Sequence, residues 1–291
     1  MILVTGASGS VGREVLLAVM KTGKPVKAMY RGAEDSRNAP SGIATVIADF
    51  ADKESLRKAL QGIETAFLVC SPIPQLVELE SNVIEVAMQT GVRHIVLNSA
   101  LGAGDYPKSF PLWHRQVEDK LKASGLRHTI LRPNTFMQNI VAYSSSSIRA
   151  QGAFYSAMGD AKLSFIDVRD IAEATAKILG NPSVHSGKIY ELNGPEALNY
   201  SEVAALISEA AGRPVQFVNI PEESQRKAML DLGMPQWQVD ALLDLQRYYT
   251  VDKKGAQITP VLEQLLGHAP TRLEQYLREN KEAFREQAAG A

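Results

Sequence analysis

The chain has 291 residues, of which 45% are hydrophobic and 22% are charged, and its formal net charge is −1. This composition allows a sizeable buried core and provides no basic field that would favour nucleic acid. The single cysteine, Cys70, excludes an intramolecular disulfide and a cysteine-rich metal site, and we expect no bound metal. A strand is predicted from Ile2 onward, and no apolar run approaches the roughly 20 residues that span a bilayer, so we expect a cytoplasmic protein without a signal peptide.

Short apolar runs alternate with amphipathic helical patterns along most of the chain. The predicted strands are residues 2–5, 26–30, 44–48, 65–70, 94–98, 128–132, 164–166 and 188–192. The predicted helices are residues 11–22, 53–60, 76–90, 112–124 and 171–179, with Asp52 as an N-cap and with Gly23 and Gly125 at helix C-termini. This alternation predicts an α/β fold with a doubly wound parallel sheet, whose ligand lies at the carboxyl ends of the strands where the strand order reverses.

The pattern changes from about residue 194. Asn199 and Glu202 have the spacing of a capping box at the start of a helix that runs to residue 211. An apolar run at 215–220 and helices at 225–232, 235–246 and 271–287 follow, and the polar tail from residue 279 is expected to fray. We therefore predict a dinucleotide-binding, Rossmann-type domain in residues 1–193. A smaller, mostly helical lobe in residues 194–291 is predicted to cover the substrate and to be joined by parts of 136–163.

A glycine-rich turn joins the first strand to the first helix. Gly6 allows a tight turn, Gly9 lets a phosphate approach the backbone, and Gly12 lets the helix pack on the strand. The helix N-terminus offers unpaired N–H groups and a partial positive charge to an anion. The turn is thus predicted to bind the pyrophosphate of a dinucleotide through Gly6, Ser8, Gly9, Ser10, Val11 and Gly12. It resembles the turn of extended and atypical short-chain dehydrogenase/reductases.

The end of the second strand indicates which nicotinamide cofactor binds. In folds of this class an acidic residue there binds the ribose 2′-OH of NADH, whereas an arginine accommodates the 2′-phosphate of NADPH. The strand is followed by Arg31, which favours NADPH. NADH is the alternative, since Glu34 and Asp35 follow closely and could face a ribose.

Several motifs together carry a family resemblance over nearly the whole chain. They are Gly6–Gly12, Arg31, Asp49, Ser99, the pair His114 and Glu118, Leu131-Arg132-Pro133, and residues 165–172. This set resembles the NmrA-like branch of the atypical short-chain reductases, most specifically over residues 1–180. That branch contains NADPH-dependent reductases of quinones, azo dyes and triphenylmethane dyes. It also contains regulators that bind the dinucleotide and catalyse nothing.

The resemblance implies further cofactor contacts at the strand ends. Asp49 would bind the adenine amino group while Phe50 packs on the ring, although Asp49 is alternatively a loop residue that binds backbone N–H groups. Phe136 would form a wall on the substrate side. The other implied contacts are Cys70, Ser71 and Pro72 along the nicotinamide ribose, and Asn98, Ser99 and Pro133 near the nicotinamide. Cys70 is expected to be a buried structural thiol, and Asp170 to cap a helix from Ile171.

The candidate catalytic residues depart from the family pattern of a serine followed by Tyr-x-x-x-Lys. In that chemistry the serine orients a carbonyl, the tyrosine transfers a proton and the lysine lowers the tyrosine pKa. Ser99 is present, but the other two positions hold His114 and Glu118, which share one helix face. They are either a proton relay or an ordinary helix-stabilising pair. Tyr106 and Lys108 are weaker candidates for the proton donor.

Two functions fit these patterns. The first is an NAD(P)H-dependent reductase that passes a hydride to a small, flat, conjugated acceptor such as a quinone or dye, for which solvent can supply the proton. Its aromatic pocket would draw on Trp113, Phe136, Met137 and Trp237, each of which is alternatively a core residue. The second is a non-catalytic NADP(H) sensor that acts through a protein partner, which the missing tyrosine and lysine favour. Sugar epimerase chemistry ranks third, and we expect no nucleic-acid or membrane partner.

Overall fold

Two units make up the part of the chain that the computed structural model describes, residues 1–285. The first unit contains residues 1–133, 168–192 and 264–267. The second contains residues 134–167, 193–263 and the segment from residue 268. The second unit is therefore built from stretches that lie far apart in the sequence. Within residues 1–285, no helix is both long enough and apolar enough to cross a membrane.

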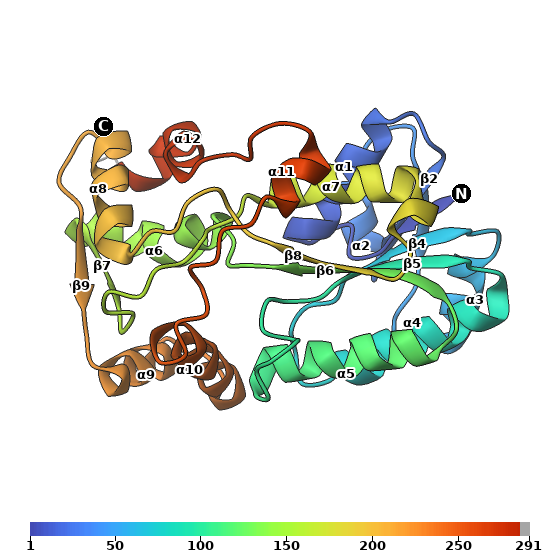
Figure 1. The fold of residues 1–291 in the computed structure, drawn as a ribbon, viewed down its shortest axis with the longest axis horizontal. Helices are drawn as coiled ribbons and strands as arrows, with labels where there is room; N and C mark the ends of the chain where they lie inside the picture. Colours follow the sequence, from blue (N-terminus) through green and yellow to red (C-terminus); the bar gives the residue numbers. More distant parts are fainter. Residues whose placement is uncertain (286–291) are drawn as a thin grey trace. The chain divides into compact units, whose positions relative to one another are not determined.

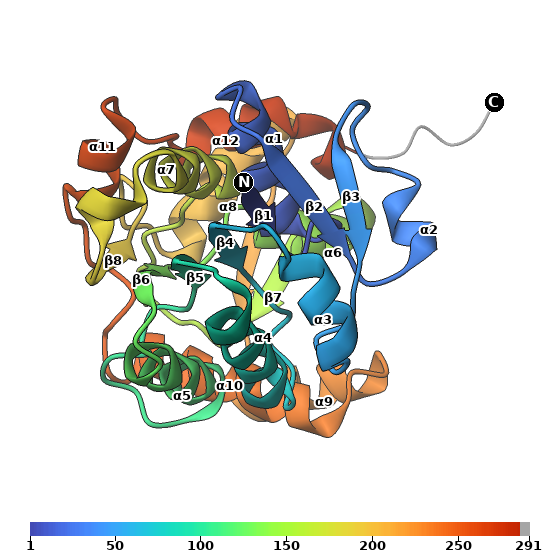
Figure 2. The same cartoon turned by 90° about the vertical axis from the view of Figure 1, so that its right-hand side faces the viewer.

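A seven-stranded parallel sheet forms the centre of the first unit (Figures 1 and 2). Its strands, in chain order, are β1 (Ile2–Val4), β2 (Val26–Tyr30), β3 (Ala44–Ile47), β4 (Thr65–Leu68), β5 (His94–Asn98), β6 (Arg127–Pro133) and β8 (Lys188–Leu192). The spatial order is β3-β2-β1-β4-β5-β6-β8. The order reverses between β1 and β4, which is where doubly wound folds bind their ligands. The predicted sheet is confirmed.

Helices cover both faces of this sheet. Figure 2 shows α3 (Lys53–Leu60), α4 (Leu76–Thr90) and α5 (Ser109–Ala123) on one face, and α1 (Ser10–Lys21) and α7 (Val168–Gly180) on the other. The short helix α2 (Ala33–Ser36) follows β2, and a 3-10 turn, Pro182–His185, precedes β8. Asp52 caps α3 by accepting a hydrogen bond from the N–H of Glu54 at 2.9 Å, as predicted. Apolar residues of α3 and α4, such as Leu56 and Val83, pack with Leu68 and Ile95 of the sheet in one buried cluster.

The second unit is mostly helical. Its helices are α6 (Gln138–Gln151), α8 (Tyr200–Ala211), α9 (Glu222–Asp231), α10 (Gln236–Thr250) and α12 (Leu273–Glu279), followed by a 3-10 turn, Lys281–Phe284, while α11 (Val261–Leu266) contributes to both units. Strands β7 (Ala153–Ser156) and β9 (Gln216–Asn219) form a small parallel sheet. The predicted capping box is confirmed, because Asn199 and Glu202 exchange side-chain to backbone hydrogen bonds of 2.8 Å.

A buried polar cluster joins the separate stretches of the second unit. The side-chain nitrogen Nδ2 of Asn134 donates to Ser164 Oγ at 2.7 Å, to Asn193 Oδ1 at 3.0 Å and to the carbonyl oxygen of Gly255 at 2.9 Å. Its own oxygen accepts the N–H of Thr135 at 2.7 Å. Since unpaired buried polar groups are costly, these bonds fix four chain segments against one another.

Four local predictions are wrong in whole or in part. Residues 164–166 form no strand, because their backbone hydrogen bonds go to several irregular segments, including Gly255 and Thr135. Helix α7 begins at Val168, so Asp170 lies within its first turn and is not its N-cap. The tail does not fray from residue 279, since Phe284 is fully buried. The helix predicted for 271–287 is shorter, and its last two residues lie outside the described part of the chain.

Candidate cofactor and active site

The glycine-rich turn has the geometry that its sequence predicts. Gly6 adopts a positive φ of 59°. A Cβ added to Gly12 would lie 2.1 Å from the carbonyl oxygen of Gly6, so only glycine lets α1 pack this closely on the turn. At Gly9 the same test gives 3.3 Å and an ordinary φ of −85°. The fold thus requires glycine at positions 6 and 12, whereas a Cβ at position 9 makes one tight backbone contact that a shift of a few tenths of an ångström would relieve.

The N-terminus of α1 is open to an anion. Its N-cap is Gly9, no side chain caps its first turn, and no acidic residue lies there. Ser8, Gly9 and Ser10 are exposed. The hydroxyl of Thr5 fixes the preceding strand end, since it accepts the N–H of Val69 at 3.0 Å and donates to its carbonyl oxygen at 3.3 Å. A 12-residue helix with an uncapped N-terminus, at the place where the strand order reverses, fits a dinucleotide pyrophosphate.

Of the two arginines that follow β2, Arg31 is the one available to bind a ligand. Glu34 pairs with Arg37 at 3.6 Å, and both side chains are largely exposed. Arg31 is exposed and forms no ion pair with the described residues. A guanidinium without a carboxylate partner can bind a phosphate without first breaking a salt bridge.

In the loop after β3, the side chain of Asp49 accepts a backbone hydrogen bond, and Asn82 of α4 supports the loop. Asp49 Oδ1 accepts the N–H of Ala51 at 2.9 Å, so one of its oxygens has the loop role considered above. The side-chain amide of Asn82 donates to the carbonyl oxygen of Phe50 at 3.0 Å and holds the loop in place. Sequence analysis missed Asn82. An asparagine beside the buried apolar residues of α4 was the available signal.

The segment after β4 lies against a buried acid that sequence analysis also missed. Burial, together with the nearby carboxyl of Glu80, raises the pKa of the half-buried Cys70 thiol to about 12, so the thiol is neutral near pH 7. Glu80 on α4 is itself fully buried, and neither of its oxygens has a hydrogen-bond partner of good geometry among residues 1–285. Burial raises its pKa to about 8, and the nearby N–H of Cys70 offsets this only in part. Ser71 and Pro72 are exposed.

Asn98 and Ser99 lie at the carboxyl end of β5 and are both buried. The backbone N–H of Ser99 donates to the carbonyl oxygen of Leu131 at 2.7 Å, and the N–H of Leu101 donates to that of Pro133 at 3.0 Å. These bonds extend the β5–β6 pairing to the strand ends. Asn98 Oδ1 is buried and has no partner among the described residues, so it can accept one hydrogen bond from a ligand.

Ser99 and Glu118 are in contact, but not as a relay through His114. Ser99 Oγ donates to Glu118 Oε1 at 2.7 Å. Arg132 donates to both oxygens of the same carboxylate, through Nε at 2.9 Å and through Nη2 at 2.7 Å. Lys122 adds a longer contact of 3.2 Å. Burial alone would raise the pKa of Glu118, but the hydrogen bonds from Arg132 and Ser99 outweigh it and lower that pKa below its usual value.

His114 is buried on the same helix as Glu118. Its Nδ1 has no hydrogen-bond partner within residues 1–285. Burial lowers its pKa to about 4, and the charge of Glu118 only partly opposes this. The imidazole is therefore neutral near pH 7. Of the weaker donor candidates, Tyr106 is buried and Lys108 is exposed at the N-cap of α5.

The match to known proteins decides the family. The model of the NmrA-like family matches residues 1–279. The chain belongs to the NmrA-like family. The predicted family and the Rossmann-type fold with a smaller, mostly helical C-terminal part are thus confirmed.

Several NmrA-like relatives and neighbours are reductases by name. An NAD(P)H azoreductase of Xenophilus azovorans is 36% identical over 247 residues, covering 84% of this chain and 86% of that protein. Quinone oxidoreductase 2 of Escherichia coli is 32% identical over 279 residues, covering 94% and 96%. A crystal structure of an Escherichia coli NADPH-dependent quinone oxidoreductase with NADPH has a TM-score of 0.88 at 31% identity, covering 96% and 99%.

The residues proposed to form an aromatic pocket differ in their surroundings. Trp113 is half-buried against the hydrophobic core of the first unit. Its ring packs edge-on against the ring of Phe110, with 5.4 Å between the ring centroids. Met137 is fully buried in the second unit and is a core residue. Phe136 is half-buried in that unit, where it pairs with Ile166, and Trp237 is exposed. Phe136 and Trp237 remain candidates for substrate contact.

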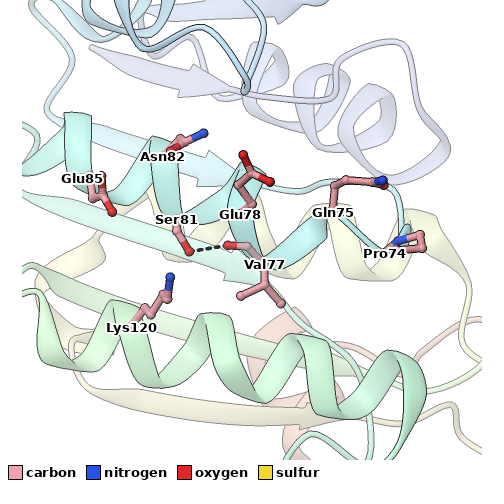
Figure 3. A pocket seen from close by; sticks show the side chains of 8 residues that line it. All are labelled: Pro74, Gln75, Val77, Glu78, Ser81, Asn82, Glu85 and Lys120. Atoms are coloured by element: carbon pink, nitrogen blue, oxygen red, sulfur yellow. Dashed lines mark hydrogen bonds between the residues drawn. The ribbon is translucent and has the colours of Figure 1, made fainter.

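An open groove runs along α4 on the side that faces Lys120 of α5 (Figure 3). It is lined by Pro74, Gln75, Val77, Glu78, Ser81, Asn82, Glu85 and Lys120. The hydroxyl of Ser81 is directed back to the carbonyl oxygen of Val77, and Glu85 is paired with Lys53 at 2.7 Å. None of the predicted cofactor or catalytic residues lines this groove, although Asn82, which supports the Phe50 loop, does.

Proposed function

We propose that this protein is an NAD(P)H-dependent reductase, with NADPH as the preferred cofactor, that acts on a flat, conjugated acceptor such as a quinone or an azo compound. The observation that carries the proposal is the uncapped N-terminus of α1 behind the turn Gly6–Gly12, at the point where the strand order reverses. The sequence relatives named as azoreductase and quinone oxidoreductase support the same chemistry.

The residues of the first unit fit the cofactor at several points. The first-turn N–H groups of α1 would hold the pyrophosphate, and Arg31 would bind the 2′-phosphate. The loop at Asp49 and Phe50, supported by Asn82, would hold the adenine. Asn98, with its unpartnered buried oxygen, would accept a hydrogen bond near the nicotinamide, where Ser99 and Pro133 would also lie. Cys70, Ser71 and Pro72 would line the path between these two ends.

The hydrogen bonds and charges of Ser99, His114 and Glu118 support this acceptor class. NADPH, when bound, supplies the hydride. His114 is neutral, Glu118 is ionised, and the Ser99 hydroxyl already donates its hydrogen bond to Glu118. A conjugated acceptor spreads the new negative charge over its π-system, so it tolerates protonation by solvent. We propose that the protein positions the acceptor and that solvent, not a side chain, supplies the proton.

The test is NADPH oxidation, followed with a panel of quinones and azo dyes, in the wild type and in a Gly9→Val variant. A Cβ at position 9 requires only a small shift of the turn, so the variant should fold but lose NADPH binding, measured by calorimetry, and lose turnover. Gly180→Ala is the matched control, because a Cβ there makes only ordinary contacts at 3.7 Å or more. NADPH binding without turnover on any acceptor would favour the alternative, a dinucleotide sensor with a protein partner. Unchanged binding in Gly9→Val would refute the proposed cofactor site.

A further inference from the structure

Glu118 is the centre of a buried ion pair that joins three elements of the first unit. Its carboxylate, on α5, is fully buried and receives both donors of the Arg132 fork, from β6, together with the hydroxyl of Ser99, from the end of β5. The Arg132 side chain is 12% exposed. Such forked pairs are stronger and more directional than single charge contacts. One carboxylate therefore links the ends of β5 and β6 to α5, in addition to the backbone hydrogen bonds between the two strands.

The same guanidinium also holds the loop that follows β5. A Cβ added to Gly104 would lie 2.6 Å from Nη1 of Arg132, so the loop backbone passes directly against it. Arg115 Nε donates to the carbonyl oxygen of Ala103 at 2.6 Å and fixes the same loop from α5. Two more exposed partners complete the surroundings: Lys122 at 3.2 Å from Glu118, and Glu191 at 3.6 Å from Arg132.

The hydrogen bonds determine what Ser99 can offer to a ligand. A serine hydroxyl has one proton and two lone pairs. The proton is directed to Glu118, which stays ionised because Arg132 is bound to both of its oxygens. Ser99 is thus left as a hydrogen-bond acceptor only. This is the opposite of the carbonyl-orienting donor that the short-chain reductase pattern implies.

We propose that Glu118 and Arg132 are a pair of positioning residues that fixes the carboxyl ends of β5 and β6 and removes Ser99 from proton donation. The position that holds a lysine in the short-chain reductase pattern thus holds a structural anion in this chain. The kinetic part of this inference rests on the proposed reductase function, whereas its structural part does not. Neither residue exchanges a proton in the reaction.

The structural part is tested by hydrogen exchange of the apo protein. Glu118→Gln preserves the shape of the side chain but removes the charge that holds the Arg132 fork. We expect the amides of Ser99 and Leu101, which pair with Leu131 and Pro133, to exchange at least about tenfold faster. The amide of Thr5, which pairs with Phe67, is the internal control and should change little. Equal acceleration at all three amides would overturn the proposal, because it would indicate only a general loss of stability.

The kinetic part is tested with acceptor turnover well below the unfolding temperature. Glu118→Gln should lower kcat roughly 10- to 100-fold through misplacement, while the KM of the acceptor and the shape of the pH–rate profile stay as in the wild type. Arg132→Lys, which keeps the charge but loses the fork, should show a partial loss. Lys122→Ala and Glu191→Ala are the controls, since both remove only an exposed partner of the pair and should leave kcat unchanged.

Two kinetic outcomes would overturn the proposal. Loss of one limb of the pH–rate profile in Glu118→Gln would make Glu118 part of a proton relay. A larger loss of kcat in Ser99→Ala than in Glu118→Gln would make Ser99 a direct donor to the substrate, since Ser99→Ala leaves the ion pair intact. If the wild type itself lacks turnover, the proposed function fails, and the exchange experiment still decides whether the pair fixes the strand ends.

Discussion

Replacing Arg31 by alanine should weaken NADPH binding much more than NADH binding. Arg31 is exposed after β2, and its neighbour Glu34 is paired with Arg37. A hydrogen bond to a charged partner contributes about 1.5–3 kcal/mol, which is about 10- to 150-fold in Kd at 1.4 kcal/mol per tenfold. Solvent screens an exposed contact of this kind, so we expect the lower end, roughly 10- to 30-fold for NADPH. NADH lacks the 2′-phosphate and should lose less than about threefold.

The measurement is the Kd of each cofactor by calorimetry in the wild type and in two variants. Arg37→Ala is the matched control, because it removes the same charge from the same loop and leaves Arg31 in place. We expect the NADPH-to-NADH preference to fall in Arg31→Ala and to hold in Arg37→Ala. Equal losses for both cofactors, or the same loss in both variants, would show that Arg31 does not select the 2′-phosphate. Raising the salt concentration should narrow the difference between wild type and Arg31→Ala.

Two further predictions concern buried titratable groups. His114→Phe should retain most of kcat, because a histidine whose pKa is lowered to about 4 is not the acid at neutral pH. A kcat loss of about 100-fold or more, with loss of a pH limb, would contradict this. The wild type should also lose stability as the pH falls from 6.5 towards 4, where the unfolded histidine binds the extra proton, and the variant should lose less in thermal melts. For Glu80, whose folded pKa is raised to about 8, stability should fall as the pH rises from 4.5 through 8. Glu80→Gln should flatten this fall, and parallel melting profiles from pH 5 to 9 would refute it.

The sheet could be predicted from sequence because each strand is a short apolar run bounded by helical patterns. The strands 26–30, 94–98 and 188–192 have the same bounds in the structure as in the prediction. The segment 138–151 was not predicted as a helix, because the serine run 144–147 has weak helix propensity. Ile140 and Ile148, both buried, show that packing overrides that propensity in α6. The strand β7 was missed as well, since its partner β9 is more than 60 residues away.

The role of a site residue could be predicted where only one residue type fits the backbone or the packing. It was harder to predict where the role depends on which residue lies opposite the side chain. The glycines at positions 6 and 12 belong to the first class, because the backbone conformation or the packing allows nothing larger. Glu118 belongs to the second. Its four-residue spacing from His114 favoured a shared role, whereas the structure directs it to Arg132, a residue 14 positions away on another element. Helical periodicity defines a face but does not reveal what lies opposite that face.

The polar cluster around Asn134 has a consequence for how the protein is made. Asn134 bonds to Gly255, 121 residues later, and to Asn193, which lies between them. The chain emerges from the ribosome with its N-terminus first. The first six strands of the sheet therefore leave the exit tunnel long before Gly255 is translated. Until then Asn134 lacks its partner Gly255, and the residues of the second unit cannot complete their core. This unit should therefore form after synthesis is nearly complete, and a stalled chain ending before residue 255 should be a preferred client of chaperones.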